Sequence, residues 1–180
     1  AVVASPVVRQ FGGARRRLIE ALQQKGIHDL AVLRAFDEVP RHLFVPTGVR
    51  HRAYEDAPLP IGHGQTISQP WVHARYLELL GLTGRERVLE IGTGSGFQTA
   101  LLSRLAGQVF TIERIAALAE DARAALTACE IEHVIQRVGD GTLGWPEHAP
   151  FDAILVGAAS PAVPRPLVEQ LAIGGQLLVP

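Results

Sequence analysis

The pattern of apolar and polar positions changes near residue 86 of this chain. Before that point, apolar residues recur at helical spacing in three stretches, residues 14–25, 30–38 and 70–80. Asp29 directly precedes the second stretch, where its carboxylate can cap the helix. The sequence therefore predicts a helical N-terminal part. Residues 1–13 are expected to be a loose arm, residues 41–60 an irregular, proline-rich segment, and residues 61–69 a polar, glycine-containing loop.

After residue 86, apolar strand-like runs alternate with helical stretches. Short, nearly continuous apolar runs indicate strands that are buried on both faces of a parallel sheet. The expected strands are 87–91, 108–112, 134–138, 151–156 and 175–179, and the expected helices are 97–106, 116–129 and 164–171. We therefore predict an α/β fold with a mainly parallel, doubly wound sheet and an N-terminal helical extension.

Length and composition narrow this picture. The 180 residues suffice for a single domain over 1–180, with helices and a functional loop in 1–86 and the α/β core in 87–180. A net charge of −1 argues against nucleic acid or an anionic membrane as the partner. No apolar run approaches the ~18 residues of a transmembrane helix. The single cysteine, Cys129, excludes an internal disulfide and indicates a reducing, cytoplasmic compartment.

One basic run needs an interpretation of its own. Arg15, Arg16 and Arg17 are consecutive on an expected helix, and no aromatic residues are interleaved with them. We interpret this run as a solvated helix face rather than a nucleic-acid patch.

The most informative motif lies at the start of the α/β part. The first strand ends with Glu90, and glycine follows at alternate positions, Gly92, Gly94 and Gly96. Glycine permits positive φ and lets a ligand approach the backbone closely. The spacing is not the G-x-G-x-x-G of dinucleotide-binding proteins, because Phe97 stands at the third glycine position. Glu-x-Gly-x-Gly-x-Gly instead resembles motif I of methyltransferases that use S-adenosylmethionine, although an ordinary strand–turn–helix corner is the simpler alternative.

Acidic residues follow three of the expected strands. Ligands of open α/β sheets bind beyond the carboxyl ends of the strands, where Glu90, Glu113 and Asp140 are expected. There Glu113 could accept hydrogen bonds from ribose hydroxyls, and Asp140 could accept one from an adenine amino group. The structural alternatives are a surface ion pair for Glu113 and helix capping by Asp140.

A longer set of motifs points to one family. Ile61–Pro70 reads Ile-Gly-His-Gly-Gln-Thr-Ile-Ser-Gln-Pro, and together with Arg41–Pro46 and Tyr54–Asp56 it resembles protein-L-isoaspartate O-methyltransferases. The Gln-Thr-Ile-Ser-Gln-Pro loop is the specific element, because other methyltransferases lack it. The similarity covers nearly all of the chain after residue 14, and it continues through Val88–Gly96, Phe110–Arg114, Gly139–Gly141, Phe151–Ala159 and Gly174–Pro180.

The resemblance implies a Rossmann-like fold and a set of site residues. Ser68 would occupy the active-site serine position. The positions expected to bind S-adenosylmethionine are Thr66, Ile67, Ser68, His73, Glu90, Gly92, Gly94, Glu113, Arg114, Asp140 and Gly141. The positions expected to flank the bound isoaspartyl peptide are Val156, Gly157, Ala158 and Ala159. Two alternatives stay open: Ser68 could cap the helix that begins at Pro70, and His73 could be a partly buried surface histidine.

The same resemblance implies the reaction. The methyl group of S-adenosylmethionine would pass to the α-carboxylate of L-isoaspartyl residues in damaged proteins, leaving S-adenosylhomocysteine. We expect a monomer that binds neither nucleic acid nor membrane. No metal is expected, because the other histidines lack metal-ligand spacing. Family sheets usually have two strands after the last one expected here, so C-terminal strands are expected to be missing from these 180 residues. The alternatives are a methyltransferase of RNA or a small molecule, a non-catalytic binding module, and an NAD-linked oxidoreductase.

Overall fold

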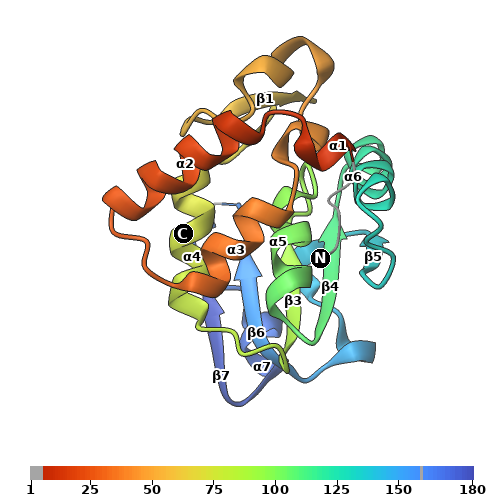
Figure 1. Ribbon diagram of the computed structural model, residues 1–180. Coiled ribbons are helices and arrows are strands. Elements are labelled where there is room, and N and C mark those ends of the chain that lie inside the picture. Colours follow the sequence, from red (N-terminus) through yellow and green to blue (C-terminus); the bar gives the residue numbers. More distant parts are fainter. Residues whose placement is uncertain (1–5, 159) are drawn as a thin grey trace.

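A parallel sheet forms the centre of the computed structural model, which describes residues 6–158 and 160–180 (Figure 1). Its five strands lie in the order β5-β4-β3-β6-β7, and every neighbouring pair is parallel. In chain order the strands are β3 (Arg87–Ile91), β4 (Gln108–Glu113), β5 (Ile135–Val138), β6 (Phe151–Val156) and β7 (Leu171–Leu178). The predicted parallel α/β sheet is confirmed.

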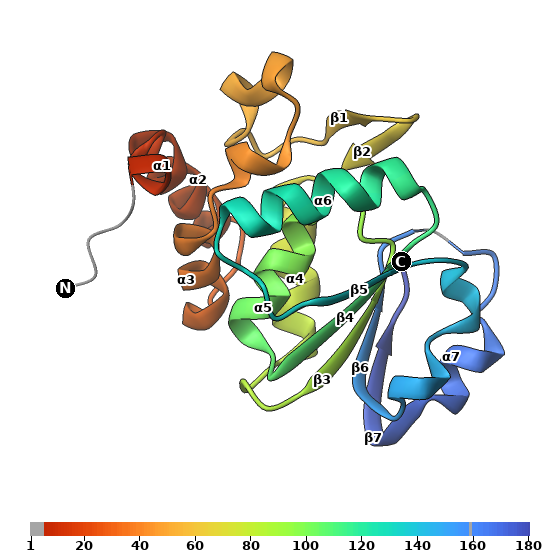
Figure 2. The ribbon, with the colours of Figure 1, turned by 90° about the vertical axis from the view of Figure 1, so that its right-hand side faces the viewer.

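Helices cover both faces of this sheet (Figure 2). The α-helices are α1 (Pro6–Arg9), α2 (Gly12–Gln24), α3 (Leu30–Glu38), α4 (Pro70–Leu80), α5 (Phe97–Leu105), α6 (Ala116–Ala128) and α7 (Arg165–Glu169). The described residues also form 3₁₀ turns, η1 (Arg41–Phe44) and η2 (Thr47–Arg52) between α3 and β1, and η3 (Gly141–Leu143) and η4 (Pro146–His148) between β5 and β6. Helices α4 and α5 lie on one face and α7 on the other. None of the helices in the described residues combines the length and apolar character needed to cross a bilayer.

The alternation of side chains along the strands divides the core in two. Val88 of β3 and Val109 of β4 belong to a large apolar cluster that also contains residues of α2, α3, α4 and α5. Leu89 of β3 faces the other way, into a smaller cluster with Trp145 and Leu167. The N-terminal helices therefore share one core with the sheet.

The expected polar loop over residues 61–69 is in part a β-hairpin, so that prediction was wrong. Strands β1 (Leu59–Gly62) and β2 (Gln65–Ile67) pair antiparallel. Gly62, His63 and Gly64 make the turn with positive φ angles of 88°, 53° and 68°. Two glycines make such a turn accessible, because they adopt left-handed φ without steric cost. Figure 2 shows the hairpin beyond one end of the sheet, on the same side as α6.

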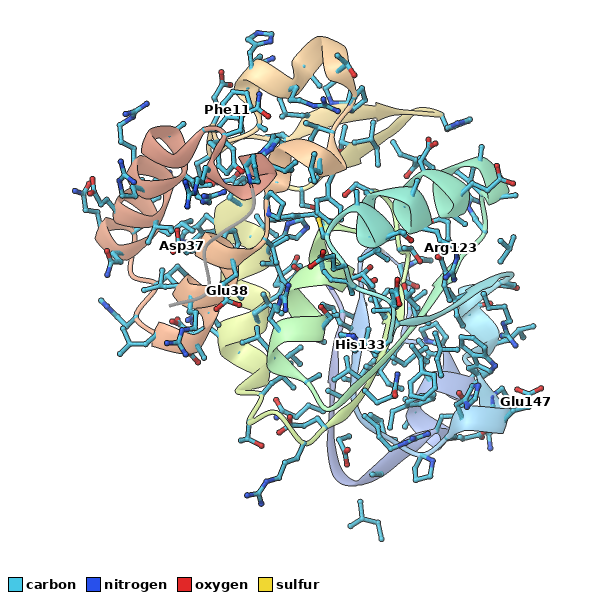
Figure 3. The ribbon with its side chains drawn as sticks, turned by 45° about the vertical axis from the view of Figure 1, so that its right-hand side comes forward. Phe11, Asp37, Glu38, Arg123, His133 and Glu147 are labelled. Carbon is cyan, nitrogen blue, oxygen red and sulfur yellow. The ribbon has the colours of Figure 1, made fainter. Side chains whose placement is uncertain are left out.

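Three further expectations need correction, two about the bounds of elements and one about the exposure of the basic run. Residues 6–9 of the expected arm form a helical turn, and the last strand begins at Leu171 rather than at residue 175. The basic run is not uniformly solvated. Arg16 and Arg17 are exposed, but Arg15 is buried, and its Nε lies 3.5 Å from an oxygen of Asp37. Figure 3 labels Asp37 and its neighbour Glu38 at the end of α3.

Candidate active site

A cavity of about 440 Å³ lies beyond the carboxyl ends of the strands. Its wall is formed by β2, the glycine loop that follows β3, and the segments after β4, β5 and β6. All of the residues expected to bind the cofactor line it: Thr66, Ile67, Ser68, His73, Glu90, Gly92, Gly94, Glu113, Arg114, Asp140 and Gly141. The fold therefore gathers into one cavity residues that are far apart in the sequence.

The glycine loop has the backbone conformation that its spacing predicted. Gly92, Gly94 and Gly96 have φ angles of 91°, 55° and 86°. A Cβ atom at Gly96 would lie 3.1 Å from Cβ of Ala122 on α6, so a larger residue would push the two helices apart. The loop is thus packed closely against α6, and Gly92 and Gly94 line the cavity.

Glu113 fixes this loop to the end of β4. Its Oε2 accepts a hydrogen bond from the amide of Gly94 at 2.8 Å, and its Oε1 accepts one from the amide of Ile115 at 3.0 Å. The side chain is buried and is in none of the ion pairs found in the described residues, so the surface ion pair is not what the structure shows. Each carboxylate oxygen can accept a second bond, which leaves room for ribose hydroxyls.

Glu90 is a buried acid inside a network of threonine hydroxyls. Its Oε1 accepts hydrogen bonds from Thr99 at 2.5 Å and from Thr111 at 2.7 Å, and only 1% of the residue is exposed. Burial raises the pKa of Glu90 to about 7, against the effect of the two hydroxyls and with a smaller contribution from the nearby Glu113. A cation in the cavity would favour the ionised form of this carboxyl group.

Asp140 caps a helical turn, as the structural alternative proposed. Its Oδ1 accepts hydrogen bonds from the amide and the hydroxyl of Thr142, at 2.9 and 2.7 Å, and these bonds lower the pKa of the exposed Asp140. Both bonds go to one oxygen, so the other can still accept a bond from a ligand. The adjacent Gly141 is closely confined, because a Cβ atom there would lie 2.4 Å from Cγ2 of Ile91.

Ser68 lies half-buried between β2 and α4, and it does not cap α4. The N-cap of α4 is Gln69, and the carboxylate of Asp56 accepts the hydrogen bond of the Trp71 amide at 2.8 Å. The carbonyl group of Ser68 accepts a hydrogen bond from Nη2 of Arg41 at 3.0 Å. The hydroxyl of Ser68 is therefore not needed to cap α4, and the hydrogen bond from Arg41 fixes the backbone of Ser68.

His73 is buried rather than at the surface. It is 8% exposed, and its Nδ1 has no hydrogen-bond partner among the described residues. Burial, and to a lesser extent the charge of Arg41, lowers the pKa of His73 to about 3. The imidazole is therefore neutral at physiological pH and is a poor base.

The residues expected to flank a peptide are only partly gathered at the cavity. Gly157 and Ala158 line it. Val156 is 4% exposed and packs in the smaller apolar cluster, and it is not among the lining residues. Ala159 lies outside the described residues.

The sequence interpretation missed some residues of this site. Tyr76 of α4 and Gln98 of α5 also line the cavity. An amide at position 98, in a helix whose other residues are mostly apolar, was a usable signal for Gln98. Among the described residues, no group of three or more His, Cys, Asp or Glu side chains is placed to hold a metal ion.

Comparison with known sequences gives a consistent result. The family model "Protein-L-isoaspartate(D-aspartate) O-methyltransferase (PCMT)" matches residues 14–180. A protein-L-isoaspartate O-methyltransferase of Synechococcus sp. is 54% identical over 171 residues, which cover 94% of this chain and 70% of that protein. A protein-L-isoaspartate O-methyltransferase 1 of Anaeromyxobacter sp. is 58% identical over 164 residues, covering 91% and 77% of the two chains.

Solved structures with this fold lead to the same family. A protein-L-isoaspartate O-methyltransferase superposes with a TM-score of 0.85 at 35% identity, over 92% of this chain and 55% of that chain. A Plasmodium falciparum protein of the same description, in complex with S-adenosyl-L-homocysteine, superposes with a TM-score of 0.78 at 27% identity, over 92% and 83% of the two chains.

Proposed function

This chain belongs to the protein-L-isoaspartate(D-aspartate) O-methyltransferase family, and from that premise we propose that it methylates the α-carboxylate of L-isoaspartyl residues in damaged proteins. S-adenosylmethionine is its cofactor, and S-adenosylhomocysteine is the product. The observation that carries the proposal is a single cavity lined both by the glycine loop with Glu90 and Glu113 and by the Thr66–Ser68 segment. Neither the ordinary strand–turn corner nor the NAD-linked alternative accounts for this combination.

In this reaction the main task of the protein is to align the substrate carboxylate with the methyl group of the cofactor. S-adenosylmethionine supplies an electrophilic methyl carbon when bound. The substrate carboxylate has an ordinary pKa near 4, so it is already a nucleophile at neutral pH and needs no general base. The neutral, weakly basic His73 is consistent with this, since its pKa of about 3 makes it a poor proton acceptor.

Ser68 is the residue that we assign to the substrate. Its hydroxyl would donate a hydrogen bond that orients the α-carboxylate toward the methyl carbon without removing a proton. Holding the reacting atoms in line contributes up to ~7–11 kcal/mol in favourable model reactions. In the ester formed in this way, the backbone amide nitrogen that follows would attack the ester carbonyl and expel methanol, closing a succinimide without further help from the enzyme. Hydrolysis of the succinimide would return part of the product as normal aspartate.

Several finer features are part of the same proposal. We place the enzyme in the cytoplasm as a monomer that acts on peptides and proteins, rather than on nucleic acid or membranes. The net charge of −1 supports protein substrates, because it provides no strong field for polyanions. Cys129 is half-buried and burial raises its pKa to about 11, so it is a weakly reactive thiol that suits a reducing compartment.

A methyl-transfer assay tests the proposal directly. The chain is incubated with radiolabelled S-adenosylmethionine and an isoaspartyl peptide, and the same peptide with normal aspartate is the matched control. We expect base-labile label in the isoaspartyl peptide alone. Label in RNA or a small molecule offered in parallel would indicate a different substrate. Tight binding of S-adenosylhomocysteine without turnover of any substrate would indicate a non-catalytic module.

A further inference from the structure

The wall of the cavity contains a buried side-chain amide whose hydrogen-bonding groups are unused in the described part of the chain. Gln98 is the second residue of α5, lines the cavity and is 7% exposed. Neither its Nε2 nor its Oε1 makes a hydrogen bond within the described residues. An amide removed from water without partners costs free energy, and most buried polar groups in proteins are therefore paired. A ligand in the cavity is the natural source of the missing partners.

The order of the strands shows which part of the ligand reaches Gln98. Asp140 follows β5, Glu113 is the last residue of β4, and Glu90 is the penultimate residue of β3; these strands are consecutive in the sheet. With the adenine at Asp140 and the ribose at Glu113, as the proposed function requires, the amino-acid end of S-adenosylmethionine extends toward β3. Helix α5 begins directly after the glycine loop at that end, with Gln98 in its first turn.

A second unpartnered group lies on the neighbouring helix. His73 of α4 is buried and lines the cavity, and no described residue forms a hydrogen bond with its Nδ1. Its ring centroid lies 5.5 Å from that of Phe97, the residue before Gln98. The buried Glu90 and the N-terminus of α5 add a negative and a partly positive group to the same wall. This wall therefore offers both signs of charge and unused hydrogen-bonding groups, which suits a zwitterion.

We propose that Gln98 binds the amino-acid end of S-adenosylmethionine, with Nε2 donating to the α-carboxylate and Oε1 accepting from the α-ammonium group. An amide carries a donor and an acceptor side by side, so it can satisfy both charged groups, whereas a charged side chain would repel one of them. The proposal rests on the proposed function and assigns a residue to one end of its cofactor.

Comparing two ligands, with and without the amino-acid end, on the wild type and on a Gln98 variant tests this assignment. The dissociation constants of S-adenosylhomocysteine and of 5′-methylthioadenosine, which lacks the amino-acid end, are measured by calorimetry for the wild type and for Gln98→Leu. We expect the variant to bind S-adenosylhomocysteine roughly 10- to 100-fold more weakly, since its hydrogen bonds to charged groups are lost. Its affinity for 5′-methylthioadenosine should stay within about twofold of the wild type.

Two controls separate this effect from general damage. Gln136→Leu removes another poorly satisfied glutamine, one whose Nε2 donates to the carbonyl of Ala119 at 2.9 Å and which does not line the cavity. It should leave both affinities unchanged. Ligand-free Gln98→Leu should melt at or above the wild-type temperature, because an unpaired amide has been removed. If leucine prevents folding, Gln98→Ala serves in the same comparison.

The opposing outcomes are distinct. Unchanged affinity of Gln98→Leu for S-adenosylhomocysteine, or equal weakening of both ligands, would overturn the role of Gln98. Failure of the wild type to bind either ligand would instead contradict the proposed function itself.

Discussion

Arg41 shows how a single buried side chain can organise a site that it does not line. It is 1% exposed, and its Nε and Nη2 donate to the carbonyl groups of Ala53 and Ser68, at 2.8 and 3.0 Å. Its guanidinium carbon also lies 4.8 Å from the ring centroid of Phe97 at the start of α5. Burial lowers the pKa of Arg41 to about 9, partly offset by the charge of Asp56. One arginine thus connects the Ser68 segment to the helix that follows the glycine loop.

Because Arg41 holds the backbone of Ser68, the serine hydroxyl can be removed without moving its segment. We expect Ser68→Ala to lower kcat for methyl transfer to an isoaspartyl peptide by about 10- to 100-fold, the range expected for one hydrogen bond to a charged group. The affinity for S-adenosylhomocysteine should change little. Steady-state kinetics and calorimetry on the same preparation check both parts, and wild-type turnover in the variant would remove Ser68 from the mechanism.

The raised pKa of Glu90 predicts a pH-dependent stability. The folded pKa of about 7 lies above the ordinary value of 4.5, so the folded protein binds the proton more tightly than the unfolded chain. The stabilising effect of protonation is complete below pH 4.5 and is lost as the pH rises through 7. Glu90→Gln, which cannot ionise, should escape this loss.

Urea unfolding of the ligand-free proteins measures this difference. Relative to the wild type, Glu90→Gln should gain on the order of 2–3 kcal/mol between pH 4.5 and pH 8. Using one variant at two pH values cancels any constant effect of the amide on packing. A stability difference that does not vary with pH would mean that Glu90 titrates normally in the folded protein.

At the scale of the elements, local signals predicted most of the boundaries. Helix α3 spans Leu30–Glu38 as expected, because Asp29 accepts hydrogen bonds from the amides of Ala31 and Val32. Helix α4 begins at Pro70 as expected, since proline at the first helical position needs no amide partner. Strands β3 and β6 also have their predicted limits, because short apolar runs bounded by loops leave little choice of register.

Tertiary packing decided what the sequence did not predict. The β1–β2 hairpin places Leu59 and Ile61 in the larger apolar cluster together with residues of distant helices. Its strands of four and three residues are too short for their alternation to stand out in the sequence. Likewise the spacing of acids and glycines predicted Glu113 and Gly92. The amide of Gln98 in a mostly apolar helix was a local signal that we did not use, whereas nothing local indicates that Arg41 is buried. Residues at strand ends were therefore predicted, and Arg41 and Gln98, whose burial depends on how helices pack, were missed.

The turn that follows Asp140 is sensitive to the size of residue 141. A Cβ atom at Gly141 would lie 2.4 Å from Cγ2 of Ile91, so Gly141→Ala must displace η3 or the glycine-loop end of β3. We expect this variant to bind S-adenosylhomocysteine at least fivefold more weakly in calorimetry, a loss of about 1 kcal/mol. Gly48→Ala is the matched control, since a Cβ atom there meets nothing within 4 Å. Equal affinities of the two variants would show that the position of η3 does not matter for binding.

In the whole molecule, the cofactor wall and the Ser68 segment belong to one cooperative structure. The larger apolar cluster contains Ile67 beside Ser68, Phe97 of α5 and Leu118 of α6, together with sheet residues such as Val88. Helices that precede the sheet in the sequence are thus part of the core that supports the cavity. A ligand in the cavity contacts segments that the chain visits at widely separated points, so it stabilises the fold as a unit rather than one loop.

This arrangement predicts how the molecule responds to S-adenosylhomocysteine. At a concentration 100 times Kd, binding adds about 2.7 kcal/mol to the unfolding free energy, which corresponds to a melting temperature roughly 5–10 °C higher for a chain of this size. Hydrogen exchange should slow in three separated regions that line the cavity, residues 65–68, 92–98 and 140–142, while α7 on the opposite face shows no local effect beyond the global gain. Differential scanning fluorimetry and exchange mass spectrometry test both statements. Protection confined to residues 92–98 would mean that the Ser68 segment and η3 do not close on the ligand, and the single-cavity description of the site would then be wrong.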